Sequence, residues 1–290
     1  MKEIVCISGK GGTGKSSVVS ALAWIAKENL VVADCDVDAA DLHLIFSPTA
    51  RKCEDFYSGI KAEIDPAKCI GCGLCAQKCR FDAICRKDGV YEVSALDCEG
   101  CGYCYHICPT KAISLPEQLV GNCYTSDTRF NCSLVHAKLG IGADNSGKLV
   151  ARVKNEAKVL AKKEEKDYLL VDGSPGIGCP VISSLSGADI VLMVTEPSLS
   201  AQSDLARLWE LIQKFQISAA CIINKADINP EISQTIRTWL QKEGIRHLAD
   251  LPYSSDFQIA ITNGQSVTEQ NNTKWQPMFL KIWESLKEIQ

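Results

Sequence analysis

One segment near the start of the chain is more informative than any other: Gly9-Lys10-Gly11-Gly12-Thr13-Gly14-Lys15-Ser16. It matches the spacing G-x-x-x-x-G-K-[ST] of a phosphate-binding loop. Residues 3–7 before it form an apolar run typical of a buried strand, and residues 16–27 after it carry apolar side chains at helical spacing. A phosphate-binding loop requires a strand, a glycine-rich loop and a helix in this order, and this segment has all three. The alternative, a glycine-rich turn that contains a lysine by chance, would not require this context.

Each part of this loop has a physical role toward a bound nucleotide. Glycines let backbone N–H groups close around phosphates, and the helix N-terminus adds a favourable partial charge. We expect Lys15 to reach the β- and γ-phosphates and the Ser16 hydroxyl to bind Mg²⁺. The residues that we expect to bind the nucleotide here are Gly9, Lys10, Gly11, Gly12, Thr13, Gly14, Lys15, Ser16 and Ser17.

The loop contains a second lysine, Lys10. Residues 10–16, K-G-G-T-G-K-S, resemble the signature KGGxGK[ST] of the deviant Walker A ATPases, the family of MinD, ParA and the nitrogenase iron protein. The resemblance implies that Lys10 crosses a dimer interface to the nucleotide of the partner. It therefore implies a dimer, either a homodimer or a heterodimer with a paralogue.

Carboxylates follow the second predicted strand, residues 30–33, in the segment Asp34-Cys35-Asp36-Val37-Asp38. The carboxyl end of a parallel strand lies at the ligand-binding edge of the sheet, and three carboxylates there would repel one another without a cation. By resemblance, this is the D-x-D segment of the family. Its second aspartate, which matches Asp36, helps to hold the Mg²⁺ shell and the attacking water. The plainer alternative is an acidic, solvated loop.

Two further segments match the family at strand ends. Residues 168–172 are a predicted strand that ends in Asp172, as a Walker B element does, and the loop at 173–180 has the small residues and prolines of a switch segment. The motif N-K-x-D at 224–227 resembles the base-recognition motif of GTPases. In the deviant Walker A family the asparagine contacts adenine instead, so we expect ATP, with Asn224 and residues 252–256 around the base.

The chain contains 16 cysteines, which in a reducing compartment favours metal ligation over disulfides. Eight of them form two runs of C-x2-C-x2-C-x3-C, and the second run starts 29 residues after the first. This is the bacterial two-cluster ferredoxin signature, in which four thiolates hold a [4Fe–4S] cluster and the fourth cysteine of each run binds the other cluster. We assign one cluster to Cys69, Cys72, Cys75 and Cys108, and the other to Cys98, Cys101, Cys104 and Cys79.

Zinc is disfavoured at these runs because zinc ribbons use two C-x2-C pairs that lie farther apart. Arg80 stands where the ferredoxin pattern has proline, which removes no ligand. Cys6 and Cys221 lie in apolar strand patterns and are expected in the core. Cys179 follows Asp172 by seven residues, the distance at which the nitrogenase iron protein has a cysteine that binds a shared cluster. A structural role for Cys179 is the alternative, and we do not assign it to a metal.

Composition excludes several classes of function. A net charge of −4 gives no electrostatic case for nucleic acid or an anionic membrane, and no apolar run approaches the ~20 residues of a membrane span. The N-terminus enters a strand at once, so we expect no signal peptide and a cytoplasmic protein. A last helix at 274–289 has apolar side chains at helical spacing without a basic face. We expect it to pack on the sheet, although MinD ends in a membrane-binding helix.

Strands and helices alternate, so we predict an α/β fold: a doubly wound, mainly parallel sheet of the P-loop NTPase type with an inserted small α+β domain like a bacterial ferredoxin. We expect residues 1–52 and 117–290 to form the ATPase domain and residues 53–116 the insert. In the second part, residues 117–139 should return to the sheet, and a helix capped by Asn145 or Ser146 should follow.

The resemblance implies a Mg²⁺-dependent ATPase whose nucleotide state is coupled to electron transfer through two [4Fe–4S] clusters. Lys10, Lys15 and Asp36 are the expected catalytic residues, and a redox protein is the expected partner. The alternative is an iron–sulfur carrier or assembly scaffold. A positioning ATPase with a redox sensor is a third class, which the net negative charge and the lack of a basic tail disfavour.

Overall fold

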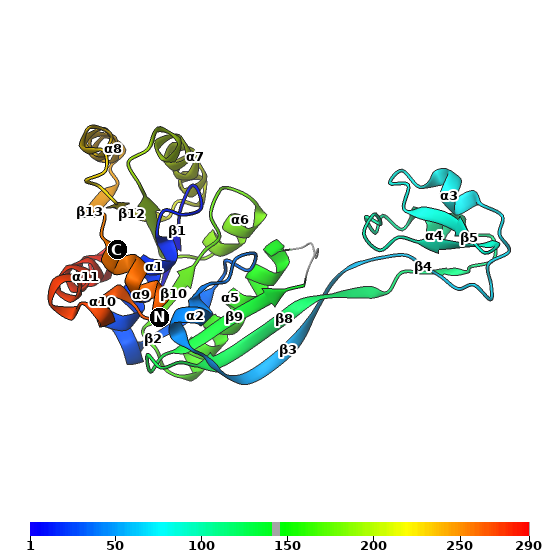
Figure 1. The fold of residues 1–290 in the computed structure, drawn as a ribbon, viewed down its shortest axis with the longest axis horizontal. Coiled ribbons are helices and arrows are strands. Elements are labelled where there is room, and N and C mark those ends of the chain that lie inside the picture. Colours follow the sequence, from blue (N-terminus) through cyan, green and yellow to red (C-terminus); the bar gives the residue numbers. More distant parts are fainter. Residues whose placement is uncertain (141–145, 290) are drawn as a thin grey trace. The chain divides into compact units, whose positions relative to one another are not determined.

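The computed structural model describes residues 1–140 and 146–289, which fall into two compact units (Figure 1). The first unit comprises Met1–Glu54, Asn122–Lys138 and the chain from Ser146 onward. The second comprises Asp55–Gly121 with residues 139 and 140. The long segment 55–121 of the second unit thus lies between two segments of the first unit, and residues 139 and 140 are a second, short segment grouped with the second unit. The expected helix cap Asn145 lies outside the described residues.

The first unit is built on a sheet with the strand order β13-β12-β11-β1-β10-β2-β9-β8-β3. Its strands from β13 to β9 are parallel to their neighbours, which confirms the mainly parallel sheet. A five-residue connection joins β8 to β9, and so short a link between neighbouring strands makes an antiparallel hairpin. The strands are β1 Lys2–Ile7, β2 Leu30–Asp34, β3 Thr49–Ile60, β8 Glu117–Asp127, β9 Ser133–Leu139, β10 Tyr168–Asp172, β11 Ile190–Thr195, β12 Ser218–Asn224 and β13 Arg246–Leu251.

Helices cover both faces of this sheet, so the fold is doubly wound as predicted. One face packs against α1, α2 and α9–α11, whose apolar side chains form one core with alternate residues of the central strands. Helix α7 contacts β11, helix α8 contacts β13, and α5 packs on α6. The helices are α1 Lys15–Ala26, α2 Leu42–Phe46, α5 Ser146–Lys163, α6 Cys179–Leu185, α7 Leu199–Phe215, α8 Pro230–Lys242, α9 Ser255–Thr262, α10 Val267–Gln270 and α11 Asn272–Lys287, with a 3₁₀ turn at Lys27–Asn29.

The last helix is part of this core. Trp275 and Phe279 in α11 are fully buried, and α11 packs on α1. This confirms the expectation that its apolar side chains face the sheet. Among the residues that the structure describes, no helix is both long and apolar enough to cross a membrane.

Strand β3 is the main feature that the sequence did not predict. Nearly all of its side chains are exposed or half-buried, because it is the edge strand of the sheet. An edge strand without a buried face has no alternation of apolar and polar residues to reveal it. The boundaries between the two units fall within β3, within β8 and at the end of β9.

The second unit shows the internal repeat in its backbone. It contains two short antiparallel pairs and two one-turn helices that contact each other. A glycine with positive φ precedes each helix: Gly73 at 76° and Gly102 at 74°, a conformation that other residues rarely adopt. The elements are β4 Glu63–Ile64, α3 Leu74–Lys78, β5 Ile84–Lys87, β6 Val90–Val93, α4 Tyr103–Ile107 and β7 Ile113–Ser114.

Candidate functional site

The glycine-rich loop joins the end of β1 to the start of α1 and borders an open cleft of about 1280 Å³. This cleft lies at the carboxyl edge of the parallel strands, where ligands bind in open α/β sheets. Asp36 and Asp38 after β2 also line it, as do Ser174 and Pro175 after β10. From the loop, the cleft is lined by Gly11, Gly12, Thr13, Gly14, Lys15, Ser16 and Ser17.

Lys15 is buried among carboxylates at the base of the cleft. Its ammonium donates to Asp172 Oδ1 and lies 3.4 Å from Asp36 Oδ2. Burial alone would lower the pKa of Lys15, but the carboxylates of Asp172, Asp36 and Asp34 outweigh burial and raise it. Lys15 therefore remains a cation, and its present partners are anions that a phosphate group can replace.

Asp34 was not among the predicted site residues, yet it is central to this cluster. It is completely buried at the end of β2, directly beside Asp172 in the register of β10. Burial, and then the charge of Asp172, raise the pKa of the Asp34 carboxyl well above its usual range. Its position as the first aspartate of the D-x-D segment was the available signal.

Two carboxylate oxygens in this cluster indicate whether its residues fit a cation. The Oδ2 atoms of Asp34 and Asp172 are buried, and neither accepts a hydrogen bond from residues 1–140 or 146–289. Buried polar atoms are nearly always satisfied in native proteins, so these oxygens require donors or positive charge. Mg²⁺ is bound through one or two carboxylates and keeps several waters, which would satisfy both oxygens. The residues present therefore fit a hydrated Mg²⁺ next to the Ser16 hydroxyl.

Asn224 supports the loop from outside the cleft. Its Nδ2 donates to the Thr13 carbonyl at 2.7 Å, and its Oδ1 accepts from the backbone N–H of Lys225 at 2.9 Å. A Cβ at Gly14 would lie 2.3 Å from Asn224 Nδ2, and Gly14 has a φ of 91°, so only glycine fits. Asn224 does not line the cleft in this structure, and its contact with adenine stays a prediction.

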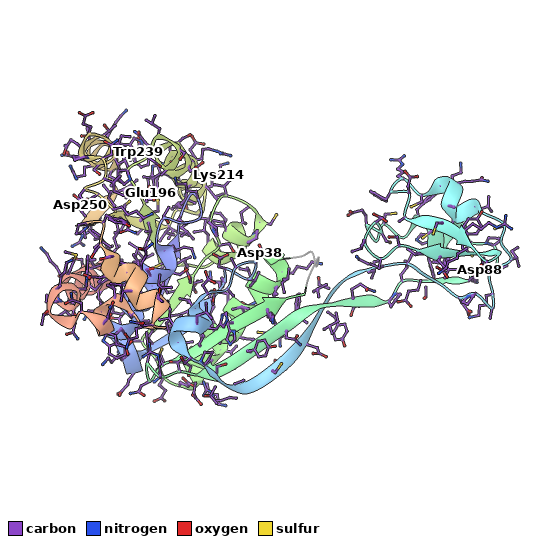
Figure 2. All side chains as sticks on the ribbon, in the orientation of Figure 1. Asp38, Asp88, Glu196, Lys214, Trp239 and Asp250 are labelled. Carbon is purple, nitrogen blue, oxygen red and sulfur yellow. The ribbon has the colours of Figure 1, made fainter. Side chains whose placement is uncertain are left out.

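Lys10 does not line the cleft either. Its ammonium lies 2.7 Å from Glu196 Oε1, and it donates to the hydroxyls of Ser198 and Ser200 at 3.1 Å each. Figure 2 labels Glu196, which comes directly after β11 and which the sequence analysis missed. No local motif marked it, because it lies far from Lys10 in sequence.

The loop after β10 is hydrogen-bonded to the neighbouring strand ends. Ser174 donates to the Cys35 carbonyl at 2.8 Å, and the Gly176 N–H donates to the Ser8 carbonyl at 2.8 Å. A segment that lines the cleft and contacts both strand ends is well placed to respond to a ligand. Cys179 follows as the exposed first residue of α6, and no metal role for it is proposed.

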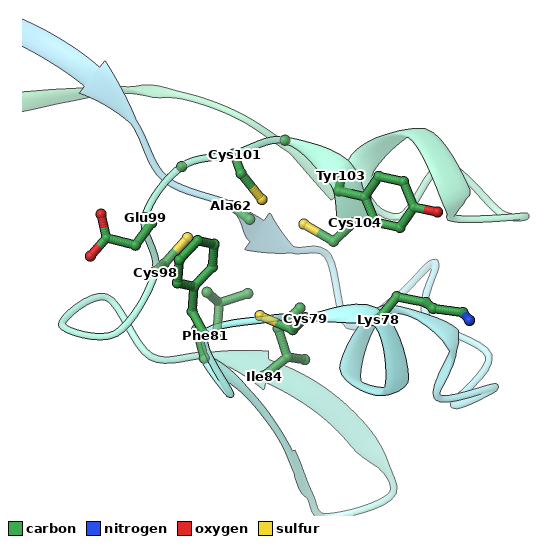
Figure 3. Close-up of a pocket in the computed structure, with 14 residues that line it drawn as sticks. Ala62, Lys78, Cys79, Phe81, Ile84, Cys98, Glu99, Cys101, Tyr103 and Cys104 are labelled. Carbon is green, nitrogen blue, oxygen red and sulfur yellow. The ribbon is translucent and has the colours of Figure 1, made fainter.

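Two cavities in the second unit gather the repeated cysteines. One is lined by Cys98, Cys101 and Cys104 together with Cys79, and Figure 3 shows these side chains around it. The other cavity is lined by the remaining four cysteines, so each cavity takes three from one run and the fourth from the other. That second set is Cys69, Cys72, Cys75 and Cys108.

The surroundings of the thiols fit iron–sulfur clusters. All 16 cysteines are free thiols, and apolar side chains such as Phe81 and Ile64 line the cavities. The backbone N–H of Ala112 donates to Cys108 Sγ at 3.3 Å, a hydrogen bond that favours a thiolate. Among the described residues, no three Cys, His, Asp or Glu side chains are close enough together to hold a single metal ion. The four thiols of each set instead border a common space.

Comparison with known proteins agrees with both parts. The family model of the 4Fe-4S dicluster domain matches residues 62–115. MinD from Pyrococcus horikoshii in complex with Mg-ADP matches with a TM-score of 0.58 and 17% identity, over 99% of this chain and 96% of that chain. The ATP complex of McdA from Cyanothece matches with a TM-score of 0.59 and 15% identity, over 100% of this chain and 98% of that one.

The chain has a P-loop α/β fold similar to the folds of MinD and McdA, and it carries a 4Fe-4S dicluster domain within its chain. A relative matches over nearly the full length: MJ0578 of Methanocaldococcus jannaschii is 35% identical over 290 residues, 99% of this chain and 97% of the relative. The chain belongs to the same family as MJ0578.

Proposed function

We propose that this protein is a Mg²⁺-dependent ATPase that acts as a dimer and couples its nucleotide state to electron transfer through two [4Fe–4S] clusters. The observation that carries the proposal is the pairing of two sites in one chain. A phosphate-binding loop opens on a carboxylate-lined cleft, and two cavities are each lined by four cysteines. Nucleotide binding is supported by the solved structures of similar fold, since the MinD structure is a complex with Mg-ADP and the McdA structure a complex with ATP.

Phosphoryl transfer requires positioning and charge stabilisation more than covalent chemistry by the protein. In this proposal, the loop N–H groups and Lys15 bind the phosphates, and Ser16 binds Mg²⁺. Asp34 and Asp172 would help to hold the hydrated metal through their buried carboxylate oxygens, while Asp36 would orient the attacking water. When bound, Mg²⁺ supplies charge that neutralises the phosphate oxygens. Lys10 of each protomer reaches the nucleotide of the partner.

We propose residues 53–116 as the inserted domain and assign electron transfer to it, because both cysteine sets belong to this segment. When bound, the two clusters supply one-electron redox chemistry. The protein contributes the thiolates and apolar surroundings, which set the potentials. The partner in this proposal is a redox protein, and the compartment is the cytoplasm.

The first test separates nucleotide binding from dimer-dependent turnover. With anaerobically purified protein, Lys10→Ala should keep its affinity for Mg–ATP within a few-fold but lose ATP-dependent dimerisation and at least about 100-fold in turnover, because an arginine finger with the corresponding role contributes 10³–10⁵. Lys214→Ala on the exposed side of α7 is the control and should behave as wild type. Normal turnover by Lys10→Ala would refute the trans role.

The second test addresses the clusters. An electron-transfer role predicts two [4Fe–4S] clusters per chain that remain bound through repeated reduction and oxidation, measured by iron content and electron paramagnetic resonance. Transfer of a cluster to an acceptor apoprotein at the rate of ATP turnover would favour the carrier role instead.

A further inference from the structure

The glycine-rich loop passes directly against the beginning of α7. A Cβ at Gly9 would lie 2.6 Å from the Cβ of Asp204, so the backbone of the loop touches this helix. Lys10 follows Gly9, and its side chain lies along the first residues of α7 rather than over the cleft. The lysine is therefore held on its own protomer, away from the phosphate site of its own loop.

One carboxylate holds two lysines at this position. Glu196 Oε1 lies 2.7 Å from Lys10, and Oε2 lies 2.8 Å from Lys225, which also donates to the Gly12 carbonyl at 3.0 Å. Burial would raise the pKa of Glu196, but hydrogen bonds from Lys10 and Lys225 outweigh it, so the pKa is lowered and the carboxylate is ionised at neutral pH. Glu196 is thus a shared anion between the two lysines.

Without Glu196, this position would not favour a cation. Lys10 donates to Ser198 and Ser200, and Ser198 caps α7 through the backbone N–H of Ala201. The N-terminus of a helix carries a partial positive charge, which repels an ammonium group. The two hydroxyls supply hydrogen bonds but no negative charge. The charge of Glu196 is therefore what holds Lys10 against α7.

We propose that Glu196 is the resting partner of Lys10 in the nucleotide-free protomer, and that it competes with the nucleotide of the partner for this lysine. The inference rests on the proposed trans role of Lys10. Dimer formation then requires each protomer to break one Lys10–Glu196 ion pair. Glu196 is a positioning residue that raises the protein concentration at which the ATP-bound dimer forms.

The competition has a predictable size. Ion pairs between partly exposed side chains contribute up to about 1 kcal/mol, which corresponds to about 5-fold in an equilibrium constant. Because two pairs break per dimer and each contributes about 0.2–1 kcal/mol, or about 1.4- to 5-fold, Glu196→Gln should lower the dimer dissociation constant by about 2- to 25-fold. Glutamine keeps the shape and removes only the charge.

The experiment uses the full-length, cluster-loaded protein under anaerobic conditions and has two readouts. The first is the rate at which an amine-reactive reagent modifies Lys10 without nucleotide, measured by mass spectrometry. Glu196→Gln should raise this rate at least about 2-fold, with Lys214 as an internal reference. The second is the dimer dissociation constant with Mg²⁺ and a non-hydrolysable ATP analogue, measured by analytical ultracentrifugation.

Two further variants make the result specific. Glu210→Gln removes the same charge from the exposed side of α7 and should leave both readouts unchanged. Lys10→Ala combined with Glu196→Gln should dimerise no better than Lys10→Ala alone, because the effect acts through Lys10. A lower dimer dissociation constant in the double variant than in Lys10→Ala alone would show that Glu196 acts through Lys225 or the loop. That result would overturn the proposal.

The failure of this inference is distinguishable from failure of the proposed function. Unchanged Lys10 reactivity, or an unchanged or weaker dimer, in Glu196→Gln would refute the resting role of Glu196. An analogue-dependent dimer in Lys10→Ala as tight as in wild type would refute the trans role of Lys10, whatever the labelling rates. Far-ultraviolet circular dichroism and an unchanged denaturation midpoint in every variant verify that the first unit, which contains Lys10 and Glu196, is folded.

Discussion

The buried carboxyl of Asp34 is unfavourable for folding, because burial and the neighbouring Asp172 outweigh the charge of Lys15 and raise its pKa. Asp34 is completely buried beside Asp172, and its Oδ2 accepts no hydrogen bond from the part of the chain that the structure describes. Buried like charges are unfavourable, so Asp34→Asn should raise the free energy of unfolding of the nucleotide-free protein by about 1 kcal/mol. The same change should weaken Mg²⁺-dependent ATP binding at least about 10-fold.

Chemical denaturation and nucleotide titration with and without Mg²⁺ measure these opposite effects. Ser47→Ala, at the end of α2 and away from the carboxylates, serves as the control for stability. A variant that loses stability while it binds Mg–ATP normally would contradict the assignment of Asp34 to the metal site.

His136 makes stability depend on pH. It lies half-buried in β9, stacks on Tyr124, and has a pKa lowered to about 4 by burial and by the charge of His43. The unfolded chain binds this proton near pH 6.5 and the folded chain does not. The contribution of His136 to stability is therefore complete above about pH 6.5 and is lost as the pH falls toward 4.

Between pH 7 and pH 5 we expect His136 to account for a loss of about 1–2 kcal/mol in the free energy of unfolding, reduced from the ideal value because the ring is partly exposed. Denaturation curves at both pH values compare wild type with His136→Gln. The variant should show a shallower pH dependence by this amount, and an equal slope in both proteins would contradict the burial argument.

Helix α11 belongs to the core of the first unit rather than to a membrane surface. Phe279 is fully buried in it, next to Trp275, in the cluster that covers one face of the sheet. Phe279→Ala should lower the free energy of unfolding by about 3–5 kcal/mol, because it removes a ring from a close-packed interior. Lys281→Ala, on the exposed side of the same helix, should change stability by less than about 0.5 kcal/mol. Binding of the wild-type protein to anionic vesicles through α11 would contradict this assignment.

The arrangement of the two cysteine runs predicts that loss of the fourth cysteine of one run damages the cluster held by the first three cysteines of the other run. The cavity lined by Cys69, Cys72 and Cys75 takes Cys108, and the cavity lined by the second run takes Cys79. Cys108→Ser should therefore disturb the first cluster and Cys79→Ser the second. Because only one cavity contains Tyr91, we expect two distinguishable electron paramagnetic resonance signals. Damage by Cys108→Ser that is confined to the cluster of the second run would refute the exchange.

Nucleotide and clusters should be energetically coupled if the proposed function is correct. The chain enters the second unit through β3, which follows the Asp36 segment and α2, and it returns through β8. Couplings between sites typically amount to ~1–3 kcal/mol, and for a one-electron step ~1.4 kcal/mol corresponds to roughly 59 mV. The midpoint potentials with and without a bound ATP analogue should thus differ by several tens of millivolts.

Linkage requires that reduction change the affinity for the analogue by the same factor. Paired anaerobic titrations at fixed pH measure both quantities, and Lys15→Ala, which should not bind the analogue, is the control. Identical potentials together with identical affinities in the two redox states would show that the two units are fused without coupling.

The loop motif, the cysteine repeat and the alternation of strands and helices could all be predicted from the sequence. Each depends on spacing along a short stretch of chain. In the eight residues of the loop and in the two runs of cysteines, the residue types and their spacing are enough to indicate the chemistry of the site. The doubly wound sheet and the dicluster domain follow from them, and the fold and the family match confirm both.

Contacts between distant segments were decided only by the tertiary structure. The sheet topology brings Glu196 to Lys10 and Asn224 to Thr13, and it places Asp34 beside Asp172 in register. No local pattern marks these pairs, because each depends on which strands become neighbours. The edge strand β3 was missed for a related reason. Nearly all of its side chains are exposed or half-buried, so β3 has no buried face that would impose a periodic pattern of apolar residues.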